Sequence, residues 1–232
     1  MKSNFFRLPF WLLILALSCE QRSSTEDVSR EEISYREAPG FNADSAYAYI
    51  QQQVDFGPRV PNTPGHAATR DWLIAKFEAF GWEVTPQEFT ATTHDGLKWD
   101  LTNIIATFNP GASKRILLAA HWDTRRVADK DTERQDEPIP GANDGGSGVG
   151  LLLEVARTLS AVENQPEVGV DIILFDGEDD GEPESKKVRS QSKIWWCLGS
   201  QHWSQNKHDP SYNAYFGILV DMVGGRGARF YK

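Results

Sequence analysis

The stretch Ile116-Leu117-Leu118-Ala119-Ala120-His121-Trp122-Asp123 decides how this chain folds. Its first five residues are apolar without a break, which is typical of a strand covered on both faces of a sheet. The polar residues His121 and Asp123 follow at once, so they stand where that strand ends. In open α/β sheets, ligands bind beyond the carboxyl ends of the strands. The stretch therefore predicts a central strand and a candidate site at its end.

Two more apolar runs alternate with helical patterns. The runs 170–175 and 216–222 are expected to form buried strands, and 146–162 repeats apolar residues at helical spacing. Buried strands that alternate with helices predict a three-layer α/β domain. Upstream, similar patterns predict helices over 43–57 and 66–80 and a hairpin of strands over 82–93 and 100–108.

Acidic side chains gather at the predicted strand ends. Because these ends meet at one edge of the sheet, the acids should crowd together, and crowded carboxylates stay ionised only if a cation or a shared proton compensates. Histidine and carboxylates without nearby cysteine suit a zinc ion. The residues at these ends, and at the start of the helix between them, are His121, Asp123, Asp144, Asp176, Glu178, Asp179 and Asp221.

Each of these residues taken alone has a plainer interpretation. Asp144 could be the N-cap of its helix, which is a frequent role for aspartate. The acidic run from Asp180 onward is expected to be a solvated loop, and His66 is expected only to begin a helix. It is their joint placement after strands that favours a metal site.

The composition excludes some classes of protein. The 232 residues include 24 Lys and Arg against 33 Asp and Glu, for a net charge of −9. A nucleic-acid-binding protein needs a basic surface, so no nucleic acid is expected as a partner. With two cysteines, Cys19 and Cys197, neither a disulfide scaffold nor a cysteine-based zinc module is expected. We expect a monomer.

The N-terminus predicts export. Residues 1–18 combine two basic residues with a short apolar run, as in a signal peptide. The run ends in Ala16-Leu17-Ser18-Cys19, which resembles the lipobox of bacterial lipoproteins, although an ordinary cleaved signal peptide is the alternative. The lipoprotein interpretation predicts a lipid on Cys19 that anchors the protein to a membrane of the cell envelope, a disordered tether over 19–41, and a catalytic domain over 42–232.

Several short motifs along 42–232 together resemble the M28 zinc peptidase family, and more narrowly its bacterial glutaminyl-peptide cyclotransferase branch. The resemblance implies a three-layer α/β/α fold with a mixed, mainly parallel sheet and zinc bound at the strand ends. The motifs, in the family's order, are Asp55-Phe56-Gly57-Pro58-Arg59, His121-Trp122-Asp123, Gly141-Ala142-Asn143-Asp144, Phe175-Asp176-Gly177-Glu178-Asp179 and Leu219-Val220-Asp221-Met222-Val223-Gly224.

The resemblance also implies roles for individual residues. Asp144 and Asp179 correspond to zinc ligands, and Glu178 corresponds to the general acid and base. Asp221 corresponds to an aspartate in the active-site hydrogen-bond network of the cyclases, where one zinc is bound. In the aminopeptidases of the family, which bind two zinc ions, the residues that correspond to His121 and Asp221 are ligands as well.

The implied reaction converts an N-terminal glutamine to pyroglutamate and releases ammonia, with peptide or protein N-termini as substrates. An M28-type zinc aminopeptidase is the alternative, and an inactive, membrane-anchored binding domain is a second one. The family's last zinc ligand is a histidine far beyond the motif of Asp221, where this sequence has none. We therefore expect the C-terminal elements of the fold to be missing and an edge of the sheet to be exposed.

Overall fold

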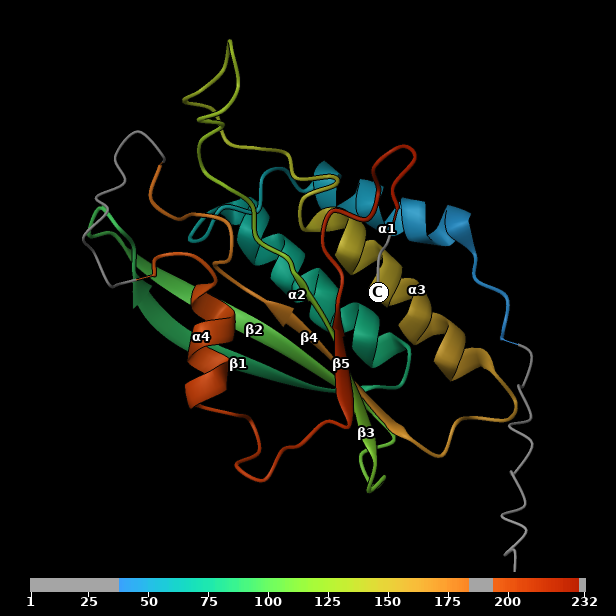
Figure 1. Ribbon diagram of the computed structural model, residues 1–232. Helices are drawn as coiled ribbons and strands as arrows, with labels where there is room; N and C mark the ends of the chain where they lie inside the picture. Colours follow the sequence, from blue (N-terminus) through green and yellow to red (C-terminus); the bar gives the residue numbers. More distant parts are fainter. Residues whose placement is uncertain (1–37, 184–193, 230–232) are drawn as a thin grey trace, which may run out of the picture. The chain divides into compact units, whose positions relative to one another are not determined.

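The computed structural model describes residues 38–183 and 194–229, all within one compact unit (Figure 1). The predicted signal peptide, Cys19 and most of the predicted tether lie outside the described residues. The remaining tether positions, 38–41, are exposed and belong to no helix or strand.

A five-stranded sheet forms the centre of this unit, in the order β1-β2-β4-β3-β5. Strand β2 pairs antiparallel with β1 and β4, whereas β3 pairs parallel with β4 and β5. The mixed sheet is thus as predicted, with the parallel pairings around β3. The strands are β1 (Glu83–Thr92), β2 (Lys98–Phe108), β3 (Arg115–His121), β4 (Gly169–Phe175) and β5 (Phe216–Leu219).

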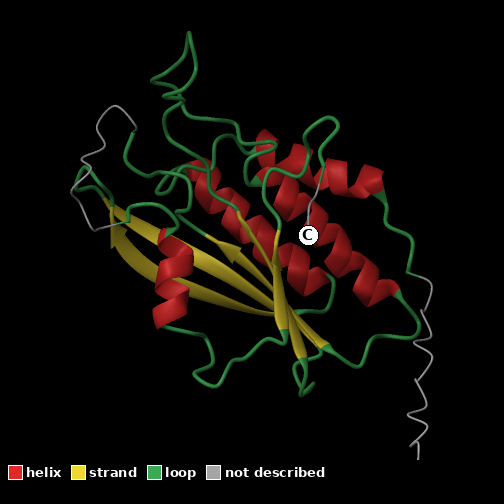
Figure 2. Cartoon of the chain, viewed as in Figure 1, coloured by secondary structure: helices red, strands yellow, loops and turns green. Residues whose placement is uncertain are grey.

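Helices cover both faces of the sheet (Figure 2), which confirms the α/β fold class. Helices α2 and α3 pack on one face, where Leu73 and Leu152 meet Ile172 of β4, and α1 lies against α3. On the other face, Trp203 of α4 packs against a smaller group that includes Ile173. The helices are α1 (Ala43–Asp55), α2 (Pro64–Ala79), α3 (Gly146–Ala161) and α4 (Leu198–Gln205).

The starts of the first two helices follow from their capping residues. The side chain of Asn42 accepts a hydrogen bond from Ser45 N at the start of α1, and Thr63 does the same for His66 N at the start of α2. Helix α3 begins differently. Its N-cap is Gly145, with a φ of 73°, and no side chain caps it. Asp144 is therefore not the N-cap, and its carboxylate is available for other contacts.

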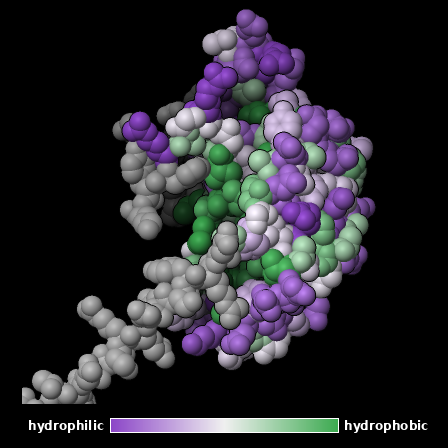
Figure 3. Space-filling view, turned by 90° about the vertical axis from the view of Figure 1, so that its right-hand side faces the viewer, coloured by the Kyte–Doolittle hydropathy of each residue, from purple (hydrophilic) through white to green (hydrophobic). Residues whose placement is uncertain are grey.

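Strand β5 differs from its prediction. A buried strand was expected over 216–222, but β5 ends at Leu219 and all four of its residues are exposed. The reason is its position: β5 pairs with β3 alone at the edge of the described sheet. Apolar residues do reach the surface of the unit as a band of green atoms (Figure 3).

None of the helices in the described part of the chain has both the length and the apolar character needed to cross a bilayer.

Candidate active site

The candidate site lies where β3, β4 and β5 end and α3 begins. His121 is the last residue of β3, and Asp144 stands two residues before α3. Glu178 and Asp179 follow β4, and Asp221 follows β5. Parallel pairing brings these ends to one edge of the sheet, since His121 pairs with Phe175. The crossover from β3 through α3 to β4 therefore brings these side chains to one edge of the sheet.

His121 lies at the centre of the acidic groups. Its Nε2 atom is 2.9 Å from Asp144 Oδ1 and 3.5 Å from Asp221 Oδ1. Its Nδ1 atom is 3.5 Å from Asp123 Oδ1 and 3.9 Å from Glu178 Oε2, and it is buried without a hydrogen bond. Burial would lower the pKa of His121, but the flanking carboxylates raise it above its ordinary value.

The chemistry of this donor set fits a divalent metal ion. One ligand atom each from His121, Asp144 and Asp221 lies within 4.8 Å of the others. The His121 Nε2 atom lies 2.9 Å from Asp144 and 3.5 Å from Asp221, so the three side chains already face one another. One imidazole nitrogen and carboxylate oxygens are ligands that zinc accepts. These residues could therefore hold zinc without a large rearrangement.

Asp179 lies outside this group of three but shares a cavity with one of its members, Asp144. It lines a cavity of about 850 Å³ together with Asp144, Arg125 and Trp196. Burial and the negative charges of Asp144 and Asp123 raise the pKa of Asp179 to about 8. A carboxyl group so placed is fully ionised near neutral pH only if a positive charge compensates.

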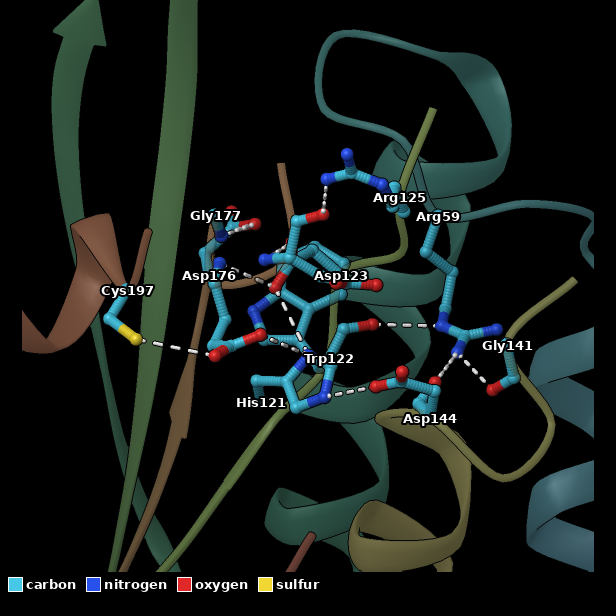
Figure 4. A network of polar contacts seen from close by, with 12 residues as sticks. Arg59, His121, Trp122, Asp123, Arg125, Gly141, Asp144, Asp176, Gly177 and Cys197 are labelled. Carbon is cyan, nitrogen blue, oxygen red and sulfur yellow. Dashed lines mark hydrogen bonds and ion pairs between the residues drawn. The ribbon is translucent and has the colours of Figure 1, made fainter. Parts of the chain in front are cut away.

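Glu178 is held in place by Asp123 and by Cys197, both of which are labelled in Figure 4. Asp123 is fully buried, and its two oxygens accept hydrogen bonds from Glu178 N at 3.0 Å and Asp179 N at 3.1 Å. The Cys197 thiol donates to Glu178 Oε1 at 3.2 Å. Burial raises the pKa of this thiol to about 12, so it stays protonated as a donor. Burial, aided by nearby acids, also raises the pKa of Glu178, which suits a group that takes up and gives back a proton.

Asp176 does not join the acids at the rim. It is fully buried, and both of its oxygens lie 3.0 Å from His66 Nε2. The ring of His66 also stacks on Trp122, with ring centroids 4.3 Å apart. His66 was expected only to begin a helix, but it also holds the side chain of Asp176, two residues before Glu178.

Asp180 also differs from the expectation of a solvated loop. It is 2% exposed, and its Oδ2 atom lies 3.1 Å from Arg126 Nε. The ion pair with Arg126 accounts for its burial, because a buried carboxylate needs a partner.

The sequence interpretation counted Asp123 among the acids at the strand ends, but it assigned no individual role to Asp123, Cys197 or Arg59. The first was visible as the third residue of the His-x-Asp pattern, and the last was part of a quoted motif. The contact of Cys197 with Glu178 could not be predicted from the sequence, because it depends on where α4 packs.

Comparison with known proteins gives the following matches. The model of Peptidase family M28 matches residues 103–232. A Bos taurus protein named glutaminyl-peptide cyclotransferase-like protein is 32% identical over 189 residues, or 75% of this chain and 46% of the relative. The structure of glutaminyl cyclase from Tannerella forsythia is 52% identical with a TM-score of 0.79, and the match covers 84% of this chain and 66% of that one.

A structure described as a leucine aminopeptidase precursor from Bacteroides thetaiotaomicron is also similar. It is 51% identical with a TM-score of 0.78, and the match covers 83% of this chain and 66% of that one. This chain thus spans about half the length of the bovine relative and just under two thirds of these solved chains. The match to the family model extends over more than half of the sequence, and the chain belongs to peptidase family M28.

Proposed function

We propose that this protein is a zinc-dependent glutaminyl-peptide cyclotransferase, which converts the N-terminal glutamine of peptides to pyroglutamate. The observation that carries the proposal is Glu178, a half-buried carboxyl group with a raised pKa beside the donor set of His121, Asp144 and Asp221. The similarity to the Tannerella forsythia glutaminyl cyclase supports the choice of reaction.

Asp144 and Asp179 would hold the zinc ion of a cyclase, with His121 and Asp221 beside them. When bound, zinc supplies a Lewis acid that polarises a carbonyl group and stabilises negative charge on its oxygen. Asp221 contributes to the hydrogen-bond network through His121 Nε2, 3.5 Å away. The cavity lined by Asp144 and Asp179 would admit the end of the peptide.

Glu178 moves the proton in this reaction. It takes a proton from the α-amino group of the substrate as the amino nitrogen attacks the side-chain amide carbon. The same proton then passes to the departing amide nitrogen, so that the carbon–nitrogen bond breaks and ammonia leaves. The raised pKa of Glu178 favours both halves of this transfer, and the Cys197 thiol keeps the carboxyl group oriented.

The test is Glu178→Gln, which keeps the size of the side chain and removes the acid. We expect the rate of ammonia release from a Gln-initiated peptide to fall by roughly 10²–10⁴-fold, with zinc still bound. Glu163→Gln is the matched control, because Glu163 is exposed just beyond the end of α3 that is remote from the site. A retained rate in Glu178→Gln would contradict its role. Peptide binding without turnover in the unaltered protein would favour an inactive binding domain.

A zinc aminopeptidase is the second candidate. The observation in its favour is the close group of His121, Asp144 and Asp221, which could hold a second metal ion. The aminopeptidase precursor from Bacteroides thetaiotaomicron is also a close structural match. Two measurements separate the candidates: one zinc per chain and release of ammonia support the cyclase, whereas two zinc ions and release of the first amino acid support the aminopeptidase.

Export and anchoring remain part of the proposal. The basic and apolar residues of 1–18 and the lipobox-like sequence at Cys19 support a cell-envelope lipoprotein. Mass spectrometry of the mature N-terminus tests it, because lipidation leaves an acylated Cys19 as the first residue.

A further inference from the structure

Arg59 is a charged residue in the interior of the protein. It lies in the loop between α1 and α2, and its exposed fraction is 0%. Burial lowers its pKa to about 10, while the negative charges of Asp123 and Asp144 act in the opposite direction. The guanidinium is thus protonated at neutral pH, although water does not reach it. Burial of a charge costs free energy unless the group forms hydrogen bonds, so the hydrogen bonds of Arg59 must offset this cost.

The contacts of Arg59 are to backbone carbonyl oxygens. Its Nε atom donates to Trp122 O at 2.8 Å, and Nη1 donates to Pro140 O at 3.0 Å. Its Nη2 atom donates to Gly141 O at 2.6 Å and approaches Asp144 O at 3.5 Å. Among the residues that the structure describes, no carboxylate forms an ion pair with Arg59. One guanidinium therefore binds two separate segments, 122 and 140–144.

These two segments carry the candidate ligands (Figure 4). Trp122 stands between His121 and Asp123. The hydrogen bond from Arg59 to the Trp122 carbonyl therefore fixes the backbone just after β3. The carbonyl groups of 140–144 belong to the loop that ends in Asp144. His121 Nε2 and Asp144 Oδ1 come from different segments and still lie 2.9 Å apart. The planar guanidinium spans the gap between the two segments with fixed geometry.

The loop is shaped to receive this side chain. Gly141 has a φ of 63°, which favours glycine. A Cβ atom at this position would lie 2.7 Å from Arg59 Nη2 and would also clash with Thr124. The glycine thus allows the backbone to approach the guanidinium closely.

We propose that Arg59 is the positioning residue of the metal site: it clamps the backbone next to His121 to the loop of Asp144, and so fixes the direction in which Asp144 faces the metal ion. The inference rests on the proposed zinc site. The proposal predicts the opposite of what the charge of Arg59 alone would predict for metal affinity. Removal of a nearby positive charge should by itself strengthen binding of a cation, whereas loss of the clamp should weaken it.

The experiment measures metal binding directly, with Co²⁺ as a spectroscopic probe and Zn²⁺ in competition with a chelator. The variants are Arg59→Met, which removes the donors, and Arg59→Lys, which keeps the charge and is the variant expected to fold if Arg59→Met does not. We expect the affinity for Zn²⁺ to fall by roughly 10–100-fold in Arg59→Met, the usual range for residues that orient ligands. The visible Co²⁺ spectrum should change in both variants, with Arg59→Lys intermediate in affinity.

Arg115→Met is the matched control. Arg115 binds Asp171 and the carbonyl groups of 108–110 at the opposite end of β3. Its loss should lower stability but leave the Co²⁺ spectrum and the Zn²⁺ affinity unchanged. An equal effect of both substitutions would mean that Arg59 acts only through general stability.

The outcomes separate the inference from the function on which it rests. If the unaltered protein binds neither metal, the proposed zinc site is wrong. If it binds zinc and the folded Arg59 variants bind zinc equally well or more tightly, the site stands and the clamp is refuted. Weaker binding with an altered spectrum in these variants, but not in Arg115→Met, supports the clamp.

Discussion

Replacement of Asp176 by asparagine tests the buried support under the Glu178 loop. The Oδ2 atom of Asp176 accepts a hydrogen bond from Thr102 N at 2.7 Å, and Oδ1 accepts one from Gly177 N at 2.8 Å. His66 Nε2 lies 3.0 Å from both oxygens. Every contact of this carboxylate is thus with a nitrogen, and both oxygens are needed as acceptors.

Asparagine offers one acceptor oxygen where aspartate offers two. Its amide nitrogen must face Thr102 N or Gly177 N, so that one buried N–H group loses its partner, at about 1–3 kcal/mol. His66 Nε2 also loses the carboxylate as its acceptor, which adds about 2 kcal/mol, so the total cost is about 3–5 kcal/mol. At roughly 2–4 °C per kcal/mol for a domain of this size, the Tm should fall by about 6–20 °C.

Urea and thermal unfolding of the variant, followed by circular dichroism, measure this change. Asp131→Asn is the control, because Asp131 also accepts backbone hydrogen bonds, from Glu133 N and Arg134 N, but both of these bonds are exposed to water. We expect little change there, since water replaces the lost acceptor. A loss below about 1 kcal/mol in Asp176→Asn would refute the reasoning, because it would mean that the carboxylate is no better than an amide for its three donors.

Two further predictions concern pH and the sheet edge. Hydrogen bonds from Arg157 and Asn42 lower the pKa of Glu154 below its ordinary value of 4.5. The ionised carboxylate therefore stabilises the folded state fully above pH 4.5, and this contribution is lost as the pH falls through the lower pKa of the folded protein. The free energy of unfolding should therefore fall less between neutral and acid pH in Glu154→Gln than in the unaltered protein. Urea denaturation along a pH series measures this difference, and an equal fall in both proteins would contradict the prediction. Leu219 is 65% exposed on β5, so Leu219→Lys should change the unfolding free energy by no more than about 0.5 kcal/mol and should reduce self-association in sedimentation velocity; a large loss of stability would mean that this side chain is buried in solution.

The sequence predicted the elements better than the directions of their polar side chains. Apolar runs such as 116–120 mark strands because the interior of a sheet excludes polar groups on both faces. The ends of these runs placed His121 near Asp144 and Asp221, and the structure has it there. The same reasoning placed Asp176 at the rim, but the chain turns at Gly177, with a φ of 64°, so Asp176 lies inside and Glu178 faces the site. Periodicity carries no information about such a turn.

The supporting residues were harder to predict for another reason. Arg59 is a single charged residue in a loop with glycine and proline, where exposure is the ordinary expectation. Its burial depends on three carbonyl groups that lie 63 to 82 positions further along the chain. Cys197 likewise meets Glu178 only because α4 packs beside β4. Contacts of this kind arise from tertiary structure alone.

The crossover from β3 through α3 to β4 has a consequence for folding kinetics. The candidate ligands come from both sides of this crossover, and Leu118 must already pair with Ile172 before they can meet. Such distant pairings form slowly, because closure of the intervening chain reduces its entropy first. An ion that binds only the finished arrangement adds its free energy after the rate-limiting step. It should therefore prolong the lifetime of the native state while leaving the speed of folding almost unchanged.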